Sequence, residues 1–127
     1  MSTDAYLGNP NLKKVNTPVE FTEEQILEYQ KCAKDPLYFM EKYIQIVSLD
    51  EGLIPFKLYD FQKKIVKTIH ENRFTICKLP RQSGKSTTTI SYLLHYALFN
   101  PNSNIALLAN KSSTARDILG RLQLAYE

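Results

Sequence analysis

The sequence predicts an α/β fold in which helices flank a short parallel sheet. Two apolar runs, Phe74–Leu79 and Asn104–Ala109, are short and bounded by turn residues, as is typical of buried parallel strands. Between them, residues 85–99 are long enough to form a helix. The order of strand, loop, helix and strand is that of one parallel sheet unit, and a helical segment precedes it.

Capping signals divide the first part of the chain into an arm and two helices. Residues 1–21 mix Asn, Pro, Lys and Thr without periodicity, which predicts an extended arm. Thr22 has the spacing of a capping box and begins a helix that stops before Pro36. Asp35 and Pro36 then begin a second helix, as a cap followed by a proline. We expect the apolar face of this second helix in the core: Leu37, Phe39, Met40, Tyr43 and Ile44.

Three further helices follow from apolar periodicity. Asp60 is placed to cap a helix in which Phe61, Ile65 and Ile69 recur every four residues. The helix over residues 85–99 ends at Asn100 and Pro101, and its apolar side is predicted to comprise Ile90, Leu93, Leu94, Ala97 and Leu98. The last helix runs to Glu127 and carries Ala115, Ile118, Leu119 and Leu122. Two strands alone would leave the flanking helices with uncovered apolar faces, so we expect this chain to be a truncated part of a larger protein.

Composition places the chain among globular domains without a membrane span. It has 127 residues, of which 43% are hydrophobic, and it contains no run of about 18 apolar residues and no basic and apolar leader. We therefore expect a cytosolic protein. The two cysteines, Cys32 and Cys77, lie far apart in the sequence, so no disulfide or metal role is expected for them.

The positive charge is concentrated in one stretch of the chain. The net charge is only +3, but residues 72–116 contain six Lys or Arg and no Asp or Glu. A local site for an anion is one interpretation, and a solvated basic face is the other. The six cationic residues are Arg73, Lys78, Arg81, Lys85, Lys111 and Arg116.

The loop after the first apolar run indicates phosphate binding. Residues 79–86 read Leu-Pro-Arg-Gln-Ser-Gly-Lys-Ser, which satisfies the phosphate-loop pattern except for its first glycine. Gly84 allows a tight bend, Lys85 can reach the terminal phosphates, and the Ser86 hydroxyl can bind Mg²⁺. The amides that begin the following helix add donors and the positive end of a helix dipole. The alternative is a solvated loop that leads into a helix.

Two residues outside the central triplet have candidate roles. A guanidinium at Arg81 could stabilise charge on a transferring phosphoryl group, although an exposed arginine or a surface ion pair would look the same in sequence. Gln62 lies in the segment Leu58-Tyr-Asp-Phe-Gln and could pair with the N6 and N7 edge of adenine while an aromatic neighbour stacks on the base. A glutamine on a helix surface beside core aromatic residues is the alternative.

These motifs resemble the large terminase subunit of tailed bacteriophages, the motor ATPase that packages DNA into the prohead. Three blocks carry the likeness: Asp35-Pro-Leu-Tyr-Phe-Met-Glu-Lys-Tyr43, Leu58-Tyr-Asp-Phe-Gln62 and Leu79-Pro-Arg-Gln-Ser-Gly-Lys-Ser-Thr87. Terminases characteristically lack the first glycine of the loop and carry Arg-Gln before Gly-Lys. The likeness implies a helicase-like or terminase-like P-loop NTPase domain that begins at residue 58, after an arm (1–21) and a helical segment (22–57).

The resemblance also implies roles for individual residues. Arg81 matches an arginine finger that acts in cis, Gln62 matches the adenine-recognising glutamine, and Ser86 matches the magnesium contact. Asn110–Thr114 falls where related motors contact DNA or relay the nucleotide state. The implied catalytic residues are Arg81 and Lys85, and the implied ATP-binding residues are Tyr59, Gln62, Gln82, Ser83, Gly84, Lys85, Ser86 and Thr87.

The partners implied by the resemblance are double-stranded viral DNA, the portal protein, the small terminase subunit and further copies of the same subunit. The location implied is the host cytoplasm, and the cofactors are ATP and Mg²⁺. The intact subunit would also be an endonuclease. The acidic pair that holds Mg²⁺ in the family is absent from this sequence, so we expect the chain alone to bind ATP but to hydrolyse it negligibly. Two alternatives stay open: a fragment of a helicase-like DNA-dependent ATPase, and a non-catalytic docking module with a vestigial loop.

Overall fold

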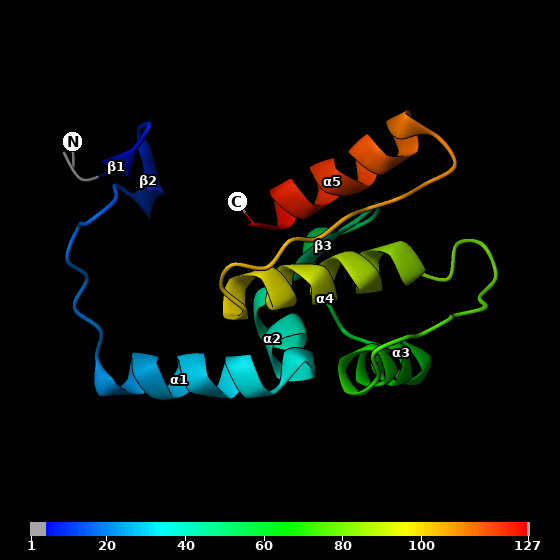
Figure 1. Ribbon diagram of the computed structural model, residues 1–127, viewed down its shortest axis with the longest axis horizontal. Coiled ribbons are helices and arrows are strands. Elements are labelled where there is room, and N and C mark those ends of the chain that lie inside the picture. Colours follow the sequence, from blue (N-terminus) through cyan, green and yellow to red (C-terminus); the bar gives the residue numbers. More distant parts are fainter. Residues whose placement is uncertain (1–4, 127) are drawn as a thin grey trace.

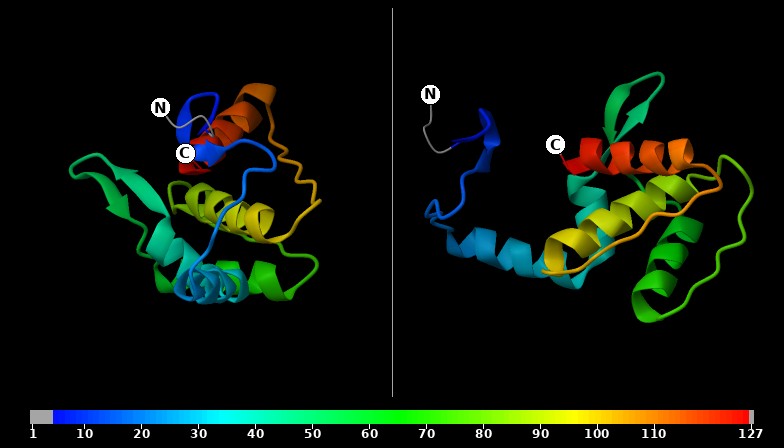
Figure 2. Two further views of the ribbon diagram at one scale, coloured as in Figure 1. Left: turned by 90° about the vertical axis from the view of Figure 1, so that its left-hand side faces the viewer. Right: turned by 45° about the horizontal axis from the view of Figure 1, so that its top comes forward.

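The computed structural model describes residues 5–126 and consists of helices with two small antiparallel hairpins (Figure 1). The first hairpin, which pairs β1 with β2, lies within the predicted arm and stands apart from the helices (Figures 1 and 2). The second hairpin pairs β3 with β4 and lies between α2 and α3 in the chain. The elements are β1 (Ala5–Tyr6), β2 (Asn9–Lys13), α1 (Glu23–Lys34), α2 (Pro36–Tyr43), β3 (Gln45–Ser48), β4 (Gly52–Pro55), α3 (Asp60–Glu71), α4 (Lys85–Phe99) and α5 (Ser112–Tyr126).

The predicted capping signals of α1 and α2 are confirmed. The Thr22 hydroxyl accepts the Gln25 amide at 3.3 Å, and the Gln25 side chain accepts the Thr22 amide at 3.0 Å, so both halves of the capping box are present. Asp35 Oδ1 accepts the amides of Leu37 at 3.0 Å and Tyr38 at 3.3 Å. Helix α2 therefore begins at Pro36 because the preceding carboxylate satisfies two of its free amides.

The first two helices are also joined by side chains. The hydroxyls of Tyr38 and Tyr43 each donate to Glu28 Oε1 at 2.9 Å, and Lys42 forms an ion pair with the same oxygen. Hydrogen bonds from Lys42 and the two tyrosines lower the pKa of Glu28 to about 2. Of the predicted face, Phe39, Met40 and Ile44 are buried and Leu37 is partly buried, whereas Tyr43 is half-exposed.

Helix α4 is packed against α2, α3 and α5. Its buried surface includes polar residues that periodicity did not predict, while Ala97 and Leu98 of the predicted side are exposed. Burial of the hydroxyls costs little because Thr88 donates to the Gly84 carbonyl and Ser91 to the Thr87 carbonyl, each at 2.8 Å. The buried residues of α4 are Thr88, Ile90, Ser91, Tyr92, Leu94 and His95.

The core contains a histidine held between aromatic rings. His95 Nε2 lies 2.8 Å from the Cys32 carbonyl oxygen, which can only accept, so this nitrogen carries the proton. The ring centroid of His95 is 5.4 Å from that of Phe39 and 4.8 Å from that of Phe99. Burial lowers the pKa of His95 below its ordinary value of 6.5.

The predicted parallel sheet is wrong. Within residues 5–126 the only ladders are the two antiparallel hairpins, and neither apolar run contributes a strand. The runs at 74–79 and 104–109 are instead largely exposed, with Ile76 98% and Leu108 88% accessible. A parallel pair of short strands is stable when further strands extend it and helices cover both its faces. Here most of the buried apolar residues come from α2, α3, α4 and the segment between α2 and α3, whereas neither run contributes a buried residue. The two runs are therefore unpaired connections.

The β3–β4 hairpin was not predicted, although its residues carry a hairpin signal. Ile46 pairs with Ile54 and Val47 with Leu53, and Gly52, the first residue of β4, follows a three-residue loop and has φ +73°. A glycine at this position allows the left-handed backbone that such loops require. Because Ile46 and Ile54 are directly opposite each other on the two strands, their side chains lie on the same face of the hairpin.

The remaining helices follow their predicted spans closely. The prediction that Asp60 caps α3 is wrong, because Tyr59 is the cap residue and Asp60 is the first residue of the helix. Helix α3 buries Ile65 and Val66, whereas Phe61 is exposed. Helix α5 rests on α4 through its partly buried Ala115, Ile118 and Leu122. Among residues 5–126, no helix has the length and apolar character needed to cross a membrane.

Replacing Asp35 by Ala should lower the free energy of unfolding by about 1 kcal/mol, because the amides of Leu37 and Tyr38 lose their acceptor. Asp50→Ala is the matched control, since it removes the same charge from an exposed turn. The measurement is urea denaturation followed by circular dichroism. Equal losses in the two variants would contradict the capping role of Asp35.

The buried His95 should make the fold less stable in acid. Its pKa is lowered in the folded state, so below pH 6.5 the unfolded chain binds more protons and the free energy of unfolding falls as pH falls. In His95→Gln, which keeps a donor for the Cys32 carbonyl, this dependence between pH 7.5 and pH 5 should be smaller. Identical slopes in the wild type and in His95→Gln would refute the assignment.

Candidate functional site

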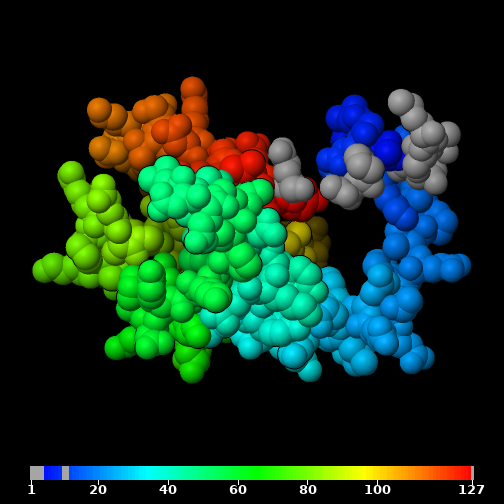
Figure 3. Space-filling view, turned by 180° about the vertical axis from the view of Figure 1, so that it is seen from behind, coloured from blue at the N-terminus to red at the C-terminus, as the bar shows by residue number. Residues whose placement is uncertain are grey.

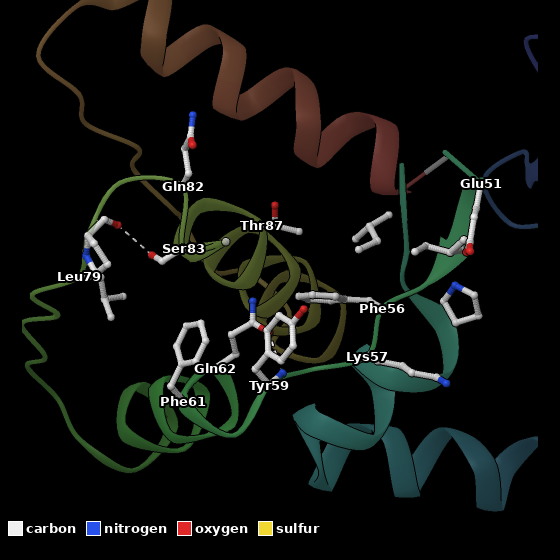
Figure 4. A pocket seen from close by; sticks show the side chains of 15 residues that line it. Glu51, Phe56, Lys57, Tyr59, Phe61, Gln62, Leu79, Gln82, Ser83 and Thr87 are labelled. Carbon is white, nitrogen blue, oxygen red and sulfur yellow. Dashed lines mark hydrogen bonds between the residues drawn. The ribbon is translucent and has the colours of Figure 1, made fainter. Parts of the chain in front are cut away.

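A cavity of about 1070 Å³ lies where the start of α3, the loop before α4 and the β3–β4 hairpin meet (Figure 4). From behind, the hairpin lies between α5 and α3, and the loop before α4 lies at the edge of the same face (Figure 3). The cavity therefore joins segments that are separated in the sequence. Its lining residues are Ile46, Glu51, Ile54, Pro55, Phe56, Lys57, Tyr59, Phe61, Gln62, Leu79, Pro80, Gln82, Ser83, Gly84 and Thr87.

The structure brings most of the predicted site residues to this cavity but not the predicted catalytic residues. Arg81 and Lys85 are exposed, and Ser86 is partly buried, but none of the three lines the cavity. The side chain of Gln82 points away from Gln62 (Figure 4). The predicted residues that do line the cavity are Tyr59, Gln62, Gln82, Ser83, Gly84 and Thr87.

The loop before α4 has the backbone geometry of an anion-binding turn. Gln82 has φ +58° and Gly84 has φ +75°, while Ser83 between them is not in the positive region. Alternation of this kind turns successive amides toward one side and forms a concavity for anions. The Ser83 hydroxyl donates to the Pro80 carbonyl at 2.9 Å, which closes the bend from within.

The first turn of α4 has free donors. Gly84 is its cap residue and offers no side chain to accept the amides of Lys85, Ser86 and Thr87, and the first intrahelical bond is from the Thr88 amide to the Gly84 carbonyl at 3.0 Å. The first turn also contains no acidic residue. The positive end of the helix dipole and its free amides thus favour an anion at this end.

Gln62 connects the start of α3 to this loop. Its Oε1 accepts the Tyr59 amide at 2.8 Å, and the side chain is only 3% exposed. A Cβ placed on Gly84 would lie 2.7 Å from Gln62 Nε2. The positive φ of Gly84 favours glycine at this position, and the end of the Gln62 side chain would have to shift to admit a Cβ there.

Two aromatic rings stand at the entrance near Gln62. Tyr59 and Phe61 have ring centroids 5.9 Å apart and planes inclined by 10°. Tyr59 is 70% exposed, so the ring offers a large accessible surface for a flat ligand. Phe61 was predicted only as a core residue and is a site residue that sequence reasoning missed.

The hairpin wall of the cavity was also missed. Ile46 and Ile54 face the cavity from opposite strands, Phe56 is buried beside them, and Glu51 and Lys57 add one charge of each sign. The sequence contained a signal, because two short runs with branched residues, Ile46-Val47 and Leu53-Ile54, flank the turn residues Asp-Glu-Gly. What it did not contain was the direction in which this hairpin faces.

The charged side chains around the site are exposed. All six cationic residues of the basic stretch are exposed, so their charge is available to solvent and to large anions alike. The part of the chain that the structure describes holds no group of three or more His, Cys, Asp or Glu residues that could bind a metal ion. A magnesium ion at Ser86 would therefore depend on one hydroxyl, phosphate oxygens and water, which is a coordination that Mg²⁺ commonly accepts.

No model of a known protein family matches this sequence.

Gly84→Ala should reduce the free energy of unfolding more than Gly52→Ala does. Both changes place a side chain at a similar positive φ, +75° and +73°, which costs about 1 kcal/mol or more. Only the new Cβ at position 84 also meets Gln62, whereas position 52 is open. Chemical denaturation of the two variants tests this, and equal losses would contradict the contact between Gly84 and Gln62.

Proposed function

We propose that the chain binds the phosphates of a nucleotide, ATP by resemblance, at the loop before α4. One observation carries the proposal: two features of an anion site lie beside the cavity that Tyr59 and Gln62 line. The first feature is the start of α4, which has no side-chain cap, and the second is the positive φ of Gln82 and Gly84 in the loop before it. Free amides, a helix dipole and a glycine bend suit an anion, and an exposed aromatic ring suits a base. This proposal needs the loop and its neighbours, not a parallel sheet.

The loop cations and hydroxyl would serve the phosphates. Lys85 is exposed on a long flexible stem, so its ammonium can turn toward a triphosphate that sits on the amides of α4. Ser86 would hold Mg²⁺ together with phosphate oxygens and water. Arg81 would stabilise the charge that develops when a phosphoryl group leaves. These roles rest on the loop sequence and on the position of the loop beside the cavity.

The wider function that we propose is the ATP-binding part of a phage terminase large subunit. Its intact form would hydrolyse ATP to move double-stranded viral DNA into the prohead and would cleave concatemeric DNA, in the host cytoplasm, with the portal protein and the small subunit. The support is the sequence of the three motif blocks, two of which, Leu58–Gln62 and Leu79–Thr87, contribute residues to the same cavity. Because the acidic pair of the family is absent, we propose that this chain alone binds ATP with negligible turnover.

A second candidate is a non-catalytic docking module. It is favoured by the exposure of Arg81 and Lys85 outside the cavity and by accessible apolar side chains such as Ile76 and Leu108. In that case the loop would bind no nucleotide and the exposed apolar runs would contact a protein. The two candidates differ in a single measurable property, which is the affinity of the loop for nucleotide.

Binding of a fluorescent ATP analogue with Mg²⁺ should separate these candidates. Lys85→Ala should weaken binding about tenfold or more, because one charge-assisted hydrogen bond to phosphate is lost. Arg81→Ala should bind like the wild type, since its proposed role is confined to the transition state. Lys67→Ala, which removes an exposed charge from α3, is the control for the loss of one positive charge.

Saturable binding that is lost only in Lys85→Ala would support the nucleotide site. Binding that is absent from the folded wild-type chain, or that Lys85→Ala and Lys67→Ala reduce equally, would reject it in favour of the docking module. Circular dichroism of each variant shows whether it is folded.

A further inference from the structure

We propose that the N-terminal arm of one chain binds in a groove between α1 and α2 of a second copy. The described part of the arm, residues 5–21, comprises the β1–β2 hairpin and a linker, and its binding segment is Leu12-Lys-Lys-Val15. The groove has a volume of about 620 Å³ and shares no lining residue with the cavity beside the loop before α4. The inference therefore goes beyond the proposed nucleotide site and does not depend on it.

The arm has apolar side chains but no core of its own. Leu7 and Val15 are each 87% exposed, and Tyr6 is half-exposed. The hairpin stands apart from α1, α2 and α4 (Figures 1 and 2). A hairpin of two short strands is marginally stable in water when no other surface covers it. The arm would therefore be stabilised by binding to a further surface.

Aromatic rings from three helices form the apolar part of the groove. Phe99, at the end of α4, has its ring centroid 5.0 Å from that of Tyr29 on α1. The ring of Phe39, on α2, lies 5.6 Å from Phe99 and 6.0 Å from Tyr43. Phe39 is buried, whereas the two tyrosines are exposed. Their rings are therefore accessible to a ligand that enters the groove.

The groove has one carboxylate more than it has basic groups. Its charged lining residues are Glu24, Glu28 and Lys42, which gives a net charge of −1. Lys42 forms an ion pair with Glu28, whereas neither of the ion pairs within residues 5–126 includes Glu24. A ligand with one cationic side chain would thus balance the charge of the groove.

The segment Leu12-Lys-Lys-Val15 matches both properties of the groove. Lys13 and Lys14 are exposed and lie between two apolar residues. In an extended segment, residues 13 and 15 point to one side and residues 12 and 14 to the other. Either side therefore presents one lysine, which can pair with Glu24, and one apolar side chain, which can pack on the aromatic rings.

The linker holds the arm away from the groove of its own chain. Residues 14–22 form no helix or strand, and nine extended residues can span about 30 Å. Thr22 is extended, with φ −75° and ψ 158°, and the capping box fixes it at the start of α1. The hairpin consequently lies clear of α1 and α2 (Figure 1). An arm held out in this way is accessible to the groove of a second copy.

Sedimentation equilibrium of the whole chain, without nucleotide, tests this interaction. The wild type should self-associate as its concentration rises. Glu24→Lys reverses the charge of the groove, and the double variant Lys13→Glu/Lys14→Glu reverses the charge of the arm. Each should weaken self-association about tenfold, because an attraction between exposed charges becomes a repulsion.

Matched controls separate the groove and the arm from general effects of charge. Glu23→Lys changes the same turn of α1 but lies outside the groove. Lys64→Glu/Lys67→Glu makes the same double reversal at exposed positions on α3. Both controls should associate like the wild type, and circular dichroism shows whether each variant is folded. Equal weakening in the controls and in the groove and arm variants would overturn the proposal.

A mixture of the two weakened variants gives the sharpest test. Glu24→Lys keeps the native arm, and Lys13→Glu/Lys14→Glu keeps the native groove, so every contact between an arm and a groove of different variants joins opposite charges. An equimolar mixture should form one-to-one pairs more strongly than either variant associates alone. A mixture that stays monomeric would overturn the proposal. A wild-type chain that is monomeric at every concentration, including one whose arm closes on its own groove, would overturn it as well.

Discussion

The packing of α4 against α2, α3 and α5 is the constraint on which the candidate site depends. Helix α4 begins directly at the loop glycine, so whatever fixes the helix also fixes the position of Gly84 and of the free amides after it. On the buried side of α4, the hydroxyls of Thr88 and Ser91 donate to carbonyls of the same helix. His95 donates to the Cys32 carbonyl and so joins α4 to α1. Because these buried polar groups are hydrogen-bonded, they can lie in the core beside the apolar residues of α4.

The cavity follows from the way in which α3 approaches the start of α4. Gln62 lies at the beginning of α3, and its approach to Gly84 is possible only because position 84 has no side chain. Gln62 therefore accepts a capping hydrogen bond at the start of α3 and also lies next to the bend before α4. The β3–β4 hairpin completes the enclosure with apolar side chains, which leaves a space that is apolar on one side and rich in backbone donors on the other. Such a division suits a ligand with a flat base and an anionic tail.

The two apolar runs show how a correct local pattern can lead to a wrong fold. The runs at 74–79 and 104–109 have the composition of buried strands, yet they are extended, unpaired and accessible. A strand differs from a helix in that its hydrogen bonds are made with another segment, so composition alone does not decide whether a strand forms. The motif loop between them keeps its bend because that bend depends on Gly84 and Gln62, which are local to the loop and to α3.

The sequence by itself determined the helix starts and six of the fifteen residues that line the cavity. Thr22 and Asp35 act within one turn of the helices that they cap, and Gly84 acts on its own backbone, so these features could be predicted from neighbours in the chain. Only the tertiary structure decided that no parallel ladder forms within residues 5–126, that Ile46 and Ile54 line the cavity, and that Arg81 and Lys85 do not. Strand pairing and the lining of the cavity both depend on contacts between segments that are far apart in the sequence. Such contacts are decided by the packing of apolar faces over the whole chain, and not by the neighbours of each residue in the sequence.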